Sequence, residues 1–338
     1  TPMNGVVGSL DLLQHSELSA YQRDLIDTVS ESALGLLTII DDILDFSKIE
    51  AGQLKLQSEA VSLERLTDSV CNALRPTATS HGVDLQVDVA PGLPDWPSAR
   101  AVLRGERAWV SAPSVLPAPA LLPPAERRRA SRVIKLALGI GLEAAAGADV
   151  STLATVFTSS GSDGHNCHAL CEQLATDDRH VSPTRFHNSV HNAPAGYWGI
   201  ATKSMAPCQV LCAFDGSFGA GLIDALGQVV LDRQPTLLMA YDSEYPEPLH
   251  SARPLPDCAG LALRLEPERT PQALARITVQ TTAEPATPWR HAPLEALRAS
   301  VPALRGLPLV ERIAQGLGGE VCLDYLPGLQ LAVRIEPA

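Results

Sequence analysis

The sequence predicts an α/β fold, in which a mixed, partly parallel sheet is covered by helices and is preceded by an α-helical hairpin. Two observations carry this prediction. Apolar residues in the first fifty positions recur at helical spacing, whereas from residue 126 onward short apolar runs alternate with amphipathic helical stretches. The 338 residues leave room for two or three domains and for one sizeable core in the C-terminal part.

Two apolar stripes predict the hairpin. The second and longer stripe consists of Leu25, Val29, Leu36, Ile40 and Ile43. The shorter stripe before it consists of Met3, Val6, Val7, Leu10 and Leu13. One short amphipathic helix cannot bury such a stripe alone, so we expect two helices joined by a turn near residues 15–19. Pairing with a second copy would give a four-helix bundle.

The rest of the chain reads as alternating helices and strands. We expect helices at 132–146, 166–175 and 219–231, and strands at 153–157, 209–214, 236–242, 260–265, 275–282, 321–325 and 329–335. Strand 209–214, helix 219–231 and strand 236–242 form a βαβ unit, which implies parallel pairing of its two strands. Pro327-Gly328 indicates a hairpin between the last two strands. Residues 111–124 hold five prolines, which predicts an extended surface arm.

Composition excludes several classes of function. The net charge of −12 argues against nucleic-acid binding, which requires clustered Lys and Arg. The run Arg127-Arg128-Arg129 is too short to change that balance. No apolar run is long enough to span a membrane, and the first residues do not read as a signal peptide. Seven cysteines without a CxxC motif favour reduced thiols and a cytoplasmic location.

Residues 1–90 resemble a known signalling family. The segment 42–52, Asp-Ile-Leu-Asp-Phe-Ser-Lys-Ile-Glu-Ala-Gly, is similar to the end of the second helix in the dimerisation domain of hybrid sensor histidine kinases. Thr1-Pro2-Met3-Asn4-Gly5 resembles the tail of that family's phosphoacceptor box, and residues 53–89 resemble its linker and first strand toward the ATP-binding domain. The resemblance places the phosphoacceptor histidine four residues before Thr1. The asparagine- and glycine-rich ATP boxes are not found downstream.

The longer part of the chain resembles another family. Residues 181–196, Val-Ser-Pro-Thr-Arg-Phe-His-Asn-Ser-Val-His-Asn-Ala-Pro-Ala-Gly, are similar to the segment before the nucleophile of β-ketoacyl synthases, and most of all to short members that hold only the N-terminal half of the thiolase-like fold. Residues 161–164 and 245–250 fit the same family. We therefore expect a truncated kinase-type dimerisation hairpin at 1–60, a linker and fusion seam at 61–97, and a thiolase-like half-domain at 98–338. We expect its first strand to be replaced by kinase-like sequence.

The resemblance implies that the nucleophile is missing. A ketosynthase carries a reactive cysteine on the sharp turn between a strand and a helix, where the helix N-terminus stabilises the thiolate. Counting along the chain assigns that slot to Asp215, or with a shift of one residue to Phe214. Cys212 is expected to lie back on the strand, where burial would keep its thiol protonated. We also expect the two decarboxylating histidines of the family's C-terminal half to be absent.

By this resemblance the chain is a non-catalytic, chain-length-factor-like subunit. Its implied partners are a catalytic ketosynthase subunit and acyl carrier protein, in acyl chain synthesis of the aryl-polyene or polyketide type, and no cofactor is expected. The residues expected at the pocket or the subunit interface are Phe186, His187, Asn188, His191, Asn192, Phe214, Asp215 and Ser217. Within this set Ser217 is expected to cap a helix, and Asp215 could do likewise.

Two groups of residues could instead bind a metal. His187 and His191 are four residues apart, so they could share a helix face, although a buried, hydrogen-bonded pair is the simpler interpretation. The segment 165–171 contains His165, Cys167, His168 and Cys171. No second ligand cluster follows it, and small buried cysteines are common in helices, so we expect no metal.

Two other interpretations stay open. The chain could be a fragment or fusion of a sensor histidine kinase that acts in phosphorelay signalling. It could also be an artificial junction of two unrelated genes. The length of the two resemblances, about 245 residues against 90, favours the ketosynthase-like interpretation.

The hairpin gives the first testable prediction. We expect residues 1–60 to self-associate only weakly, because the first helix offers few turns of apolar seam and short helices are marginal in water. Sedimentation equilibrium at micromolar concentration measures this directly. A tight dimer would contradict the expectation.

Overall fold

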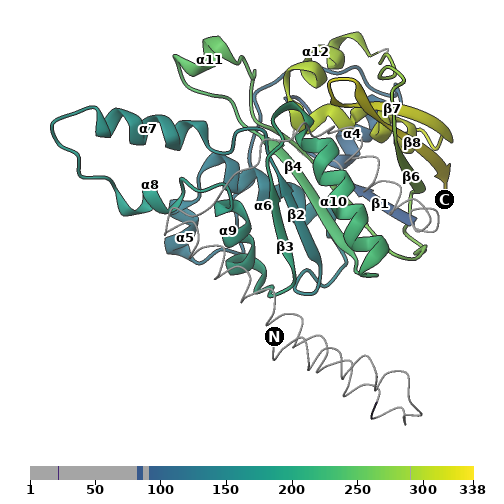
Figure 1. Ribbon diagram of the computed structural model, residues 1–338, viewed down its shortest axis with the longest axis horizontal. Coiled ribbons are helices and arrows are strands. Elements are labelled where there is room, and N and C mark those ends of the chain that lie inside the picture. The colour runs from purple at the N-terminus through teal and green to yellow at the C-terminus, as the bar shows by residue number, and fades with distance from the viewer. Residues whose placement is uncertain (1–21, 23–81, 87–90, 290) are drawn as a thin grey trace, which may run out of the picture. The chain divides into compact units, whose positions relative to one another are not determined.

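A computed structural model describes residue 22 and residues 82–86, 91–289 and 291–338 (Figure 1). Contacts divide the chain into two compact units, Thr1–Ser62 and Leu63–Ala338. The predicted hairpin lies outside the described residues except for Gln22, which is helical. The rest of this section concerns the second unit.

The described strands form one eight-stranded mixed sheet, in the order β3-β2-β4-β5-β1-β6-β8-β7. Their bounds are β1 Gly82–Gln86, β2 Ala154–Thr158, β3 Cys208–Leu211, β4 Thr236–Asp242, β5 Ala259–Leu265, β6 Ala275–Thr282, β7 Gly319–Leu326 and β8 Leu329–Pro337. Strands β3, β2 and β4 run parallel, and all other pairs are antiparallel. The predicted α/β class with a mixed sheet is confirmed.

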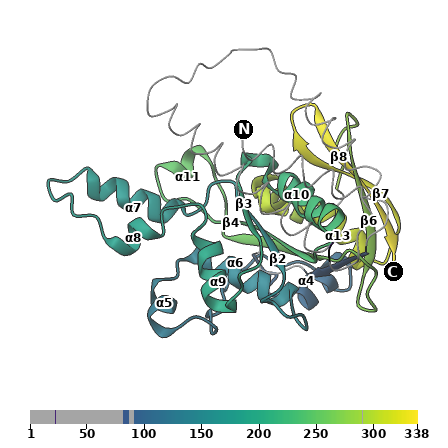
Figure 2. The same cartoon turned by 60° about the horizontal axis from the view of Figure 1, so that its bottom comes forward.

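Helices occupy both faces of this sheet (Figure 1 and Figure 2). The α-helices are α4 Trp96–Leu103, α5 Pro124–Arg129, α6 Arg132–Ala144, α7 Gly164–Leu174, α8 Pro183–His187, α9 Ala193–Thr202, α10 Ser217–Leu231, α11 Leu249–Ala252, α12 Ala292–Ser300 and α13 Leu307–Ala314. Two short 3₁₀ helices, η2 Phe214–Gly216 and η3 Pro302–Gly306, complete the described set.

Strand β4 separates two apolar cores because its side chains alternate between the faces of the sheet. Leu238 and Ala240 belong to the core under α10, together with Leu222 of that helix. Leu237 and Met239 belong to the opposite core, which α6 and α9 cover. Burial on both faces explains why this strand reads as a continuous apolar run in the sequence.

The βαβ prediction needs a correction. Strands β3 and β4 are parallel, but β2 lies between them and pairs with both. A crossover helix makes the two strands that it connects parallel, but it does not determine whether another strand lies between them. The predicted direct pairing of β3 with β4 is therefore wrong, although their parallel direction is correct. The predicted strand 209–214 is also too long, since β3 ends at Leu211 and Phe214 begins a 3₁₀ turn.

Strand β1 lies within the range 61–97, which we expected to be a linker. It pairs antiparallel with β5 on one side and with β6 on the other, with Val83 opposite Leu265 and Ala275. This part of the range is therefore an internal strand of the sheet. Helix α4 begins at Trp96, at the end of the same range, and Asp95 caps it by accepting a hydrogen bond from the Ser98 amide at 2.8 Å.

Two segments project from the sheet. Helices α7 and α8 form an arm that extends away from it in both views (Figure 1 and Figure 2). Of the predicted arm 111–124, residues 111–119 have no regular structure, and the Ser114 hydroxyl fixes them by donating to the Cys258 carbonyl at 2.8 Å. The end of the arm differs from the prediction, because Leu122 is buried and Pro124 begins α5. Among the described residues, no helix is long and apolar enough to cross a membrane.

The packing of α10 on the sheet predicts opposite changes in stability for two glycine-to-alanine variants of this helix. A Cβ added at Gly221 would lie 2.8 Å from both Leu238 Cδ1 and Thr158 Cγ2, whereas nothing lies within 4 Å of one added at Gly227. We expect Gly221→Ala to destabilise the fold by about 1–3 kcal/mol through overpacking. Gly227→Ala should stabilise it by about 0.5–1 kcal/mol, because alanine is the better helix former. Urea denaturation measures both, and equal effects would contradict this packing.

Candidate functional site

The turn between β3 and α10 is tight and strained at one residue. Phe214 adopts a φ of +49°, a left-handed conformation that is unfavourable for a bulky side chain. The buried Ser217 hydroxyl holds this turn, because it donates to the Phe214 carbonyl at 2.7 Å and accepts from the Ala213 amide at 3.1 Å. Ser217 is the first residue of α10, one position later than the helix cap we expected. Its hydroxyl stabilises the turn and does not cap the helix.

Phe214 is 62% exposed, and its ring is covered by an arginine. The guanidinium carbon of Arg253 lies 3.9 Å from the ring centroid, within the range of a cation–π contact. The same guanidinium binds the neighbouring carboxylate, with Arg253 Nη2 2.7 Å from Asp215 Oδ1. Arg253 therefore connects the two candidate slot residues, and Asp215 serves as an ion-pair partner.

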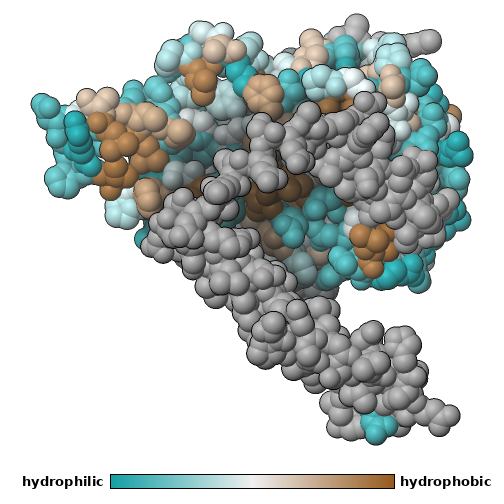
Figure 3. Space-filling view, in the orientation of Figure 1, coloured by the Kyte–Doolittle hydropathy of each residue, from teal (hydrophilic) through white to brown (hydrophobic). Residues whose placement is uncertain are grey.

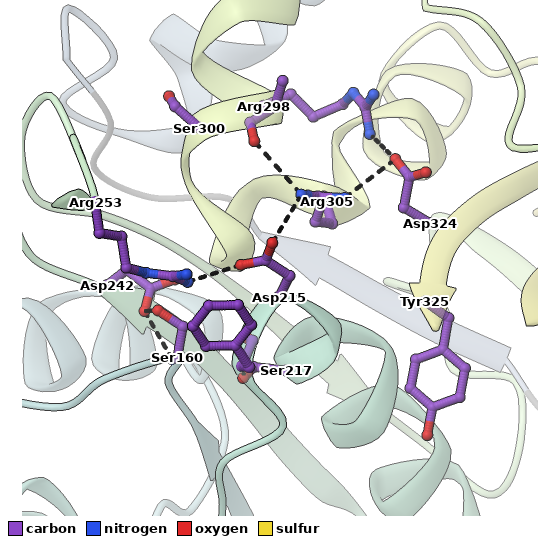
Figure 4. Close-up of polar contacts among 12 residues, drawn as sticks. Ser160, Asp215, Ser217, Asp242, Arg253, Arg298, Ser300, Arg305, Asp324 and Tyr325 are labelled. Carbon is purple, nitrogen blue, oxygen red and sulfur yellow. Dashed lines mark hydrogen bonds and ion pairs between the residues drawn. The ribbon is translucent and has the colours of Figure 1, made fainter. Parts of the chain in front are cut away.

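Asp215 also begins a chain of alternating charges (Figure 4). Its second oxygen lies 3.8 Å from Arg305 on η3, and Arg305 lies 3.5 Å from Asp324 on β7. Arg298 contacts Asp324 at 2.5 Å. Arg298 also binds Glu295, and these hydrogen bonds raise the pKa of the Arg298 guanidinium. The chain connects the turn before α10 to the C-terminal strands.

A buried carboxylate lies beside this surface chain. Asp242, at the end of β4, is 1% exposed. Its Oδ1 accepts hydrogen bonds from the Ser160 amide at 2.8 Å and hydroxyl at 2.7 Å (Figure 4). Its Oδ2 accepts from the Ala303 amide at 2.8 Å. Burial raises the pKa of the Asp242 carboxyl, while the hydrogen bonds from Ser160 and Ala303 act in the opposite direction.

The remaining candidate site residues lie at a different place, on α8 and the turn that follows it. His187 ends α8 and is exposed, whereas His191 lies in the turn before α9. The two histidines therefore do not share a helix face, because the helix ends between them. The His187 ring is 6.3 Å from that of Tyr197, and burial lowers the pKa of His191. Within the described residues, no hydrogen bond or ion pair joins this group to Phe214 or Asp215.

The other members of the α8 group divide into buried and exposed residues. Asn188 is 5% exposed and donates to the Arg129 carbonyl at 3.0 Å. Phe186 is 70% exposed, and Asn192 is also exposed. Asn188 thus has a structural role between α5 and α8, whereas Phe186 is free for contact with another molecule.

The predicted cysteine environments need correction. Cys212 follows the end of β3 and is exposed, although its thiol donates to the Ser160 carbonyl at 3.4 Å. The burial that we expected to protect it is not there. Cys167 and Cys171 are also exposed, because α7 stands out from the sheet and leaves that face uncovered.

The described residues hold one group of possible metal ligands, Glu244, Asp257 and Cys258. The Arg132 guanidinium already binds all three, at 3.0 Å from Glu244, 2.9 Å from Asp257 and 3.3 Å from Cys258 Sγ. Burial raises the pKa of the Cys258 thiol to about 11, which disfavours the thiolate that a metal needs. In the segment 165–171, His168 lies 3.2 Å from Glu172, and no three of its four candidates lie within ligand distance.

Comparison with known proteins identifies the larger part of the chain. The family model of the N-terminal domain of β-ketoacyl synthases matches residues 102–302. The chain belongs to this family. One chain of the Xenorhabdus doucetiae complex of a ketosynthase with its chain length factor has a similar fold, with a TM-score of 0.58 and 22% identity over 75% of this chain and 99% of that one. One chain of a complex between a type II polyketide synthase acyl-carrier protein and its ketosynthase gives a TM-score of 0.55 at 9% identity, over 77% of this chain and 99% of that one. These likenesses establish a thiolase-like ketosynthase fold.

The first residues of this ketosynthase-like chain match another family model. The phosphoacceptor domain of histidine kinases matches residues 1–52. The histidine-protein kinase BarA of Escherichia coli K12 is 41% identical over 95 residues, which are 28% of this chain and 10% of that protein. The chain thus spans about a tenth of the length of this curated relative. Both resemblances found in the sequence are confirmed.

The site contains residues that sequence reasoning missed. Arg253, Asp242 and Arg305 are central to the charges around the turn, but none belongs to a recognisable motif. A weak signal existed for Asp242, since an acidic residue that directly follows an apolar strand run needs a partner if the strand end is buried. Arg253 and Arg305 gave no such signal, because they reach Asp215 from segments 38 and 90 residues away.

Asp242 gives a prediction about stability. In Asp242→Asn one amide NH₂ would face an N–H donor, either that of Ser160 or that of Ala303. We expect a loss of about 2–4 kcal/mol of unfolding free energy from this unsatisfied buried group. The control is Asp224→Asn on α10, whose carboxyl has one hydrogen bond, from Gln228, and a pKa raised by burial. That variant should change stability by less than about 0.5 kcal/mol. Chemical denaturation at pH 7 measures both, and equal losses would contradict the role of Asp242.

Proposed function

We propose that this protein is a non-catalytic, chain-length-factor-like subunit of a β-ketoacyl synthase. The observation that carries the proposal is the left-handed Phe214 at the strand-to-helix turn. An enzyme nucleophile exposed on such a turn occupies a strained residue directly before the helix N-terminus. Phe214 supports this assignment because its φ is +49° and it begins the 3₁₀ turn that leads into α10. Its side chain offers no nucleophile. In this proposal Phe214, and not Asp215, fills the nucleophile slot.

The surroundings of Phe214 support the same proposal. The Arg253 guanidinium covers its ring and binds Asp215, so the space over the turn is occupied by paired side chains. A catalytic thiolate would need that space open for a thioester. This arrangement is consistent with a pocket that shapes or closes a tunnel and does no chemistry.

Strand β3 lies at the edge of the described sheet, and this edge supports a subunit partner. The Thr155 amide donates to the Pro207 carbonyl and the Ser159 amide to the Leu211 carbonyl, so alternate residues of this segment face β2. Cys208 and Val210 therefore direct their backbone N–H and C=O groups away from the described sheet. An unpaired parallel edge of this kind is a template for another strand.

Exposed apolar side chains lie in the segments that precede β3 in the sequence. Met205 is 96% exposed, Phe186 70% and Val190 50%. Figure 3 shows apolar side chains gathered on the α7–α8 arm. Exposed apolar surface of this kind suits a protein partner better than solvent.

The kind of partner is inferred from the solved relatives. One of them is a ketosynthase in complex with its chain length factor, and another is a ketosynthase in complex with an acyl-carrier protein. We infer that this chain pairs with a catalytic ketosynthase and that acyl carrier protein supplies the growing chain. The aryl-polyene or polyketide type of product belongs to the same proposal. So do the domain limits, which are 1–60 for the hairpin, 61–97 for the linker and seam, and 98–338 for the thiolase-like half-domain, except that β1 within 61–97 belongs to the sheet.

A second candidate function rests on the match of residues 1–52 to the histidine-kinase phosphoacceptor domain. In that proposal the N-terminal segment brings two copies together or connects the subunit to a phosphorelay. The match covers a short part of the chain, so we treat this role as an addition to the subunit function.

The edge of β3 gives a prediction for the partner complex. Val210→Pro removes one outward N–H, while the pairing of β3 with β2 uses alternate residues and stays intact. We expect this variant to lose at least tenfold in affinity for a catalytic ketosynthase of the family, with a small change in melting temperature. Val210→Ala, which keeps the N–H, should bind nearly as well as the wild type. Size-exclusion chromatography with light scattering measures the complex. Equal binding by all three chains would contradict the role of β3.

The slot assignment gives a prediction about acylation. In a Cys212→Ala background, which removes the exposed thiol nearest the turn, the chain should form no acyl adduct with acyl-carrier thioesters. Adding Phe214→Cys should create one, because the thiol then sits at the turn before α10. Adding Asp215→Cys instead should not. Intact-mass spectrometry detects the adduct, and labelling of the Asp215→Cys chain alone would return the slot to Asp215.

A further inference from the structure

Cys167 and Cys171 lie one helical turn apart on α7, in the arm that projects from the sheet (Figure 1 and Figure 2). Side chains four residues apart on a helix are neighbours on one face, with Cβ atoms about 5–6 Å apart. Both cysteines are exposed. Burial is the largest cause that raises the pKa of the Cys167 thiol, and the charge of Cys171 and a hydrogen bond with its thiol come next. The two sulfur atoms are therefore adjacent on an accessible face.

The exposure of this pair removes the reason for expecting no metal in the segment 165–171. That expectation assumed small cysteines packed inside the fold, where they act as structural side chains. The other described cysteines form no such pair. Cys258 is buried, and the Cys322 thiol donates to the Glu284 carbonyl at 3.3 Å. Cys208 and Cys212 are four residues apart along an extended segment, which separates them by about 13 Å.

The number of ligands at this pair determines the class of ion that it suits. Among the described residues, no third His, Cys, Asp or Glu ligand atom lies within binding distance of both thiols. His168 follows Cys167 in the sequence, but its Nε2 lies 3.2 Å from Glu172. Of the metals that thiolates select, zinc takes three or four protein ligands and iron–sulfur clusters take four. Two thiols alone leave Cu(I), the remaining soft ion of that group.

We propose that Cys167 and Cys171 bind a Cu(I) ion between their two sulfur atoms. Each thiol releases its proton to solvent and donates an electron pair to the ion, and copper keeps its oxidation state. The positive ion offsets the repulsion between two adjacent thiolates, which otherwise disfavours the second deprotonation. Both thiols stand on one helix, so the second sulfur binds at a high effective concentration once the first has bound.

The position of the pair makes this site independent of the subunit function. Neither cysteine belongs to β3 or to the turn at Phe214. The ion reaches the thiols from solvent, because α7 stands out from the sheet (Figure 2). A bound ion connects two consecutive turns of α7 and stabilises the native chain by mass action. The two proposals can therefore fail separately.

The first test is a competition for Cu(I) between the full, reduced chain and the chromogenic chelator bathocuproine disulfonate, without oxygen and with millimolar glutathione. We expect one bound ion per chain that glutathione does not remove, because a chelating pair outcompetes single thiols. Cys167→Ser and Cys171→Ser should each weaken binding at least about a hundredfold, since either change leaves one thiolate.

The matched control is Cys212→Ser, which removes an exposed thiol outside α7 and should bind Cu(I) like the wild type. His168→Gln should also bind like the wild type, because the His168 ring is not a ligand in this proposal. Two results would overturn the proposal: full binding by either cysteine variant of α7, or loss of the ion from the wild type to glutathione. The melting temperature of each variant without copper checks its folding.

Two further readouts identify the ligands without relying on affinity. X-ray absorption at the copper edge should show two sulfur neighbours, and a nitrogen neighbour that disappears in His168→Gln would contradict two-thiolate binding. Phenylarsine oxide condenses with two adjacent thiols and releases water. It should add to the wild type and to Cys212→Ser but not to Cys167→Ser or Cys171→Ser, and equal addition to all four would show that the pair is not the site. Val210→Pro should bind Cu(I) normally, which keeps this test separate from that of the subunit function.

Discussion

The hydrogen bonds of the buried Asp242 carboxylate hold the C-terminal ends of β2 and β4 in place. It ends β4 and receives hydrogen bonds from Ser160, which follows β2, and from Ala303 on η3. One side chain therefore joins the two central parallel strands to the C-terminal helical segment. A buried carboxylate is stable only when both of its oxygens accept hydrogen bonds, and both oxygens of Asp242 do so. The segments that surround the turn before α10 are fixed relative to one another by this carboxylate.

The exposed charges around the turn have a different character. Asp215 is half exposed, whereas Arg253 and Arg305 are largely buried, so the pairs that connect them to Asp215 are open to solvent on the aspartate side. Such pairs contribute little stability each. Their effect is geometric, because Arg253 holds the Phe214 ring while it binds Asp215. The turn thus combines a rigid buried support with a surface layer that a partner subunit could rearrange.

Much of the fold was predictable because its signals are local. Strand β6, the hairpin at Gly328 and helix α6 follow from alternation, turn chemistry and helical periodicity, and they agree with the structure within two residues. The position of β2 between β3 and β4 was not predictable, because strand order depends on packing between distant segments. Arg253 and Arg305 were missing from the predicted site for the same reason, because they reach Asp215 from distant segments. The separation of His187 from His191 was missed because α8 stops after five residues without a strong breaker.

Strand β1 changes how the two parts of the chain relate. Its residues fall within the segment that resembles the kinase linker and first strand, yet it pairs with both β5 and β6 in the ketosynthase-like sheet. Neighbouring strands lie about 4.8 Å apart, so without β1 the flanking strands would be about twice that distance apart and could not hydrogen-bond. A chain that began after the expected seam at 61–97 would lack β1. Its sheet would then have a gap between β5 and β6, with an unpaired edge on each side. The sheet therefore includes residues from the segment that resembles the kinase family, so the limit between the two resemblances is not a limit of the sheet.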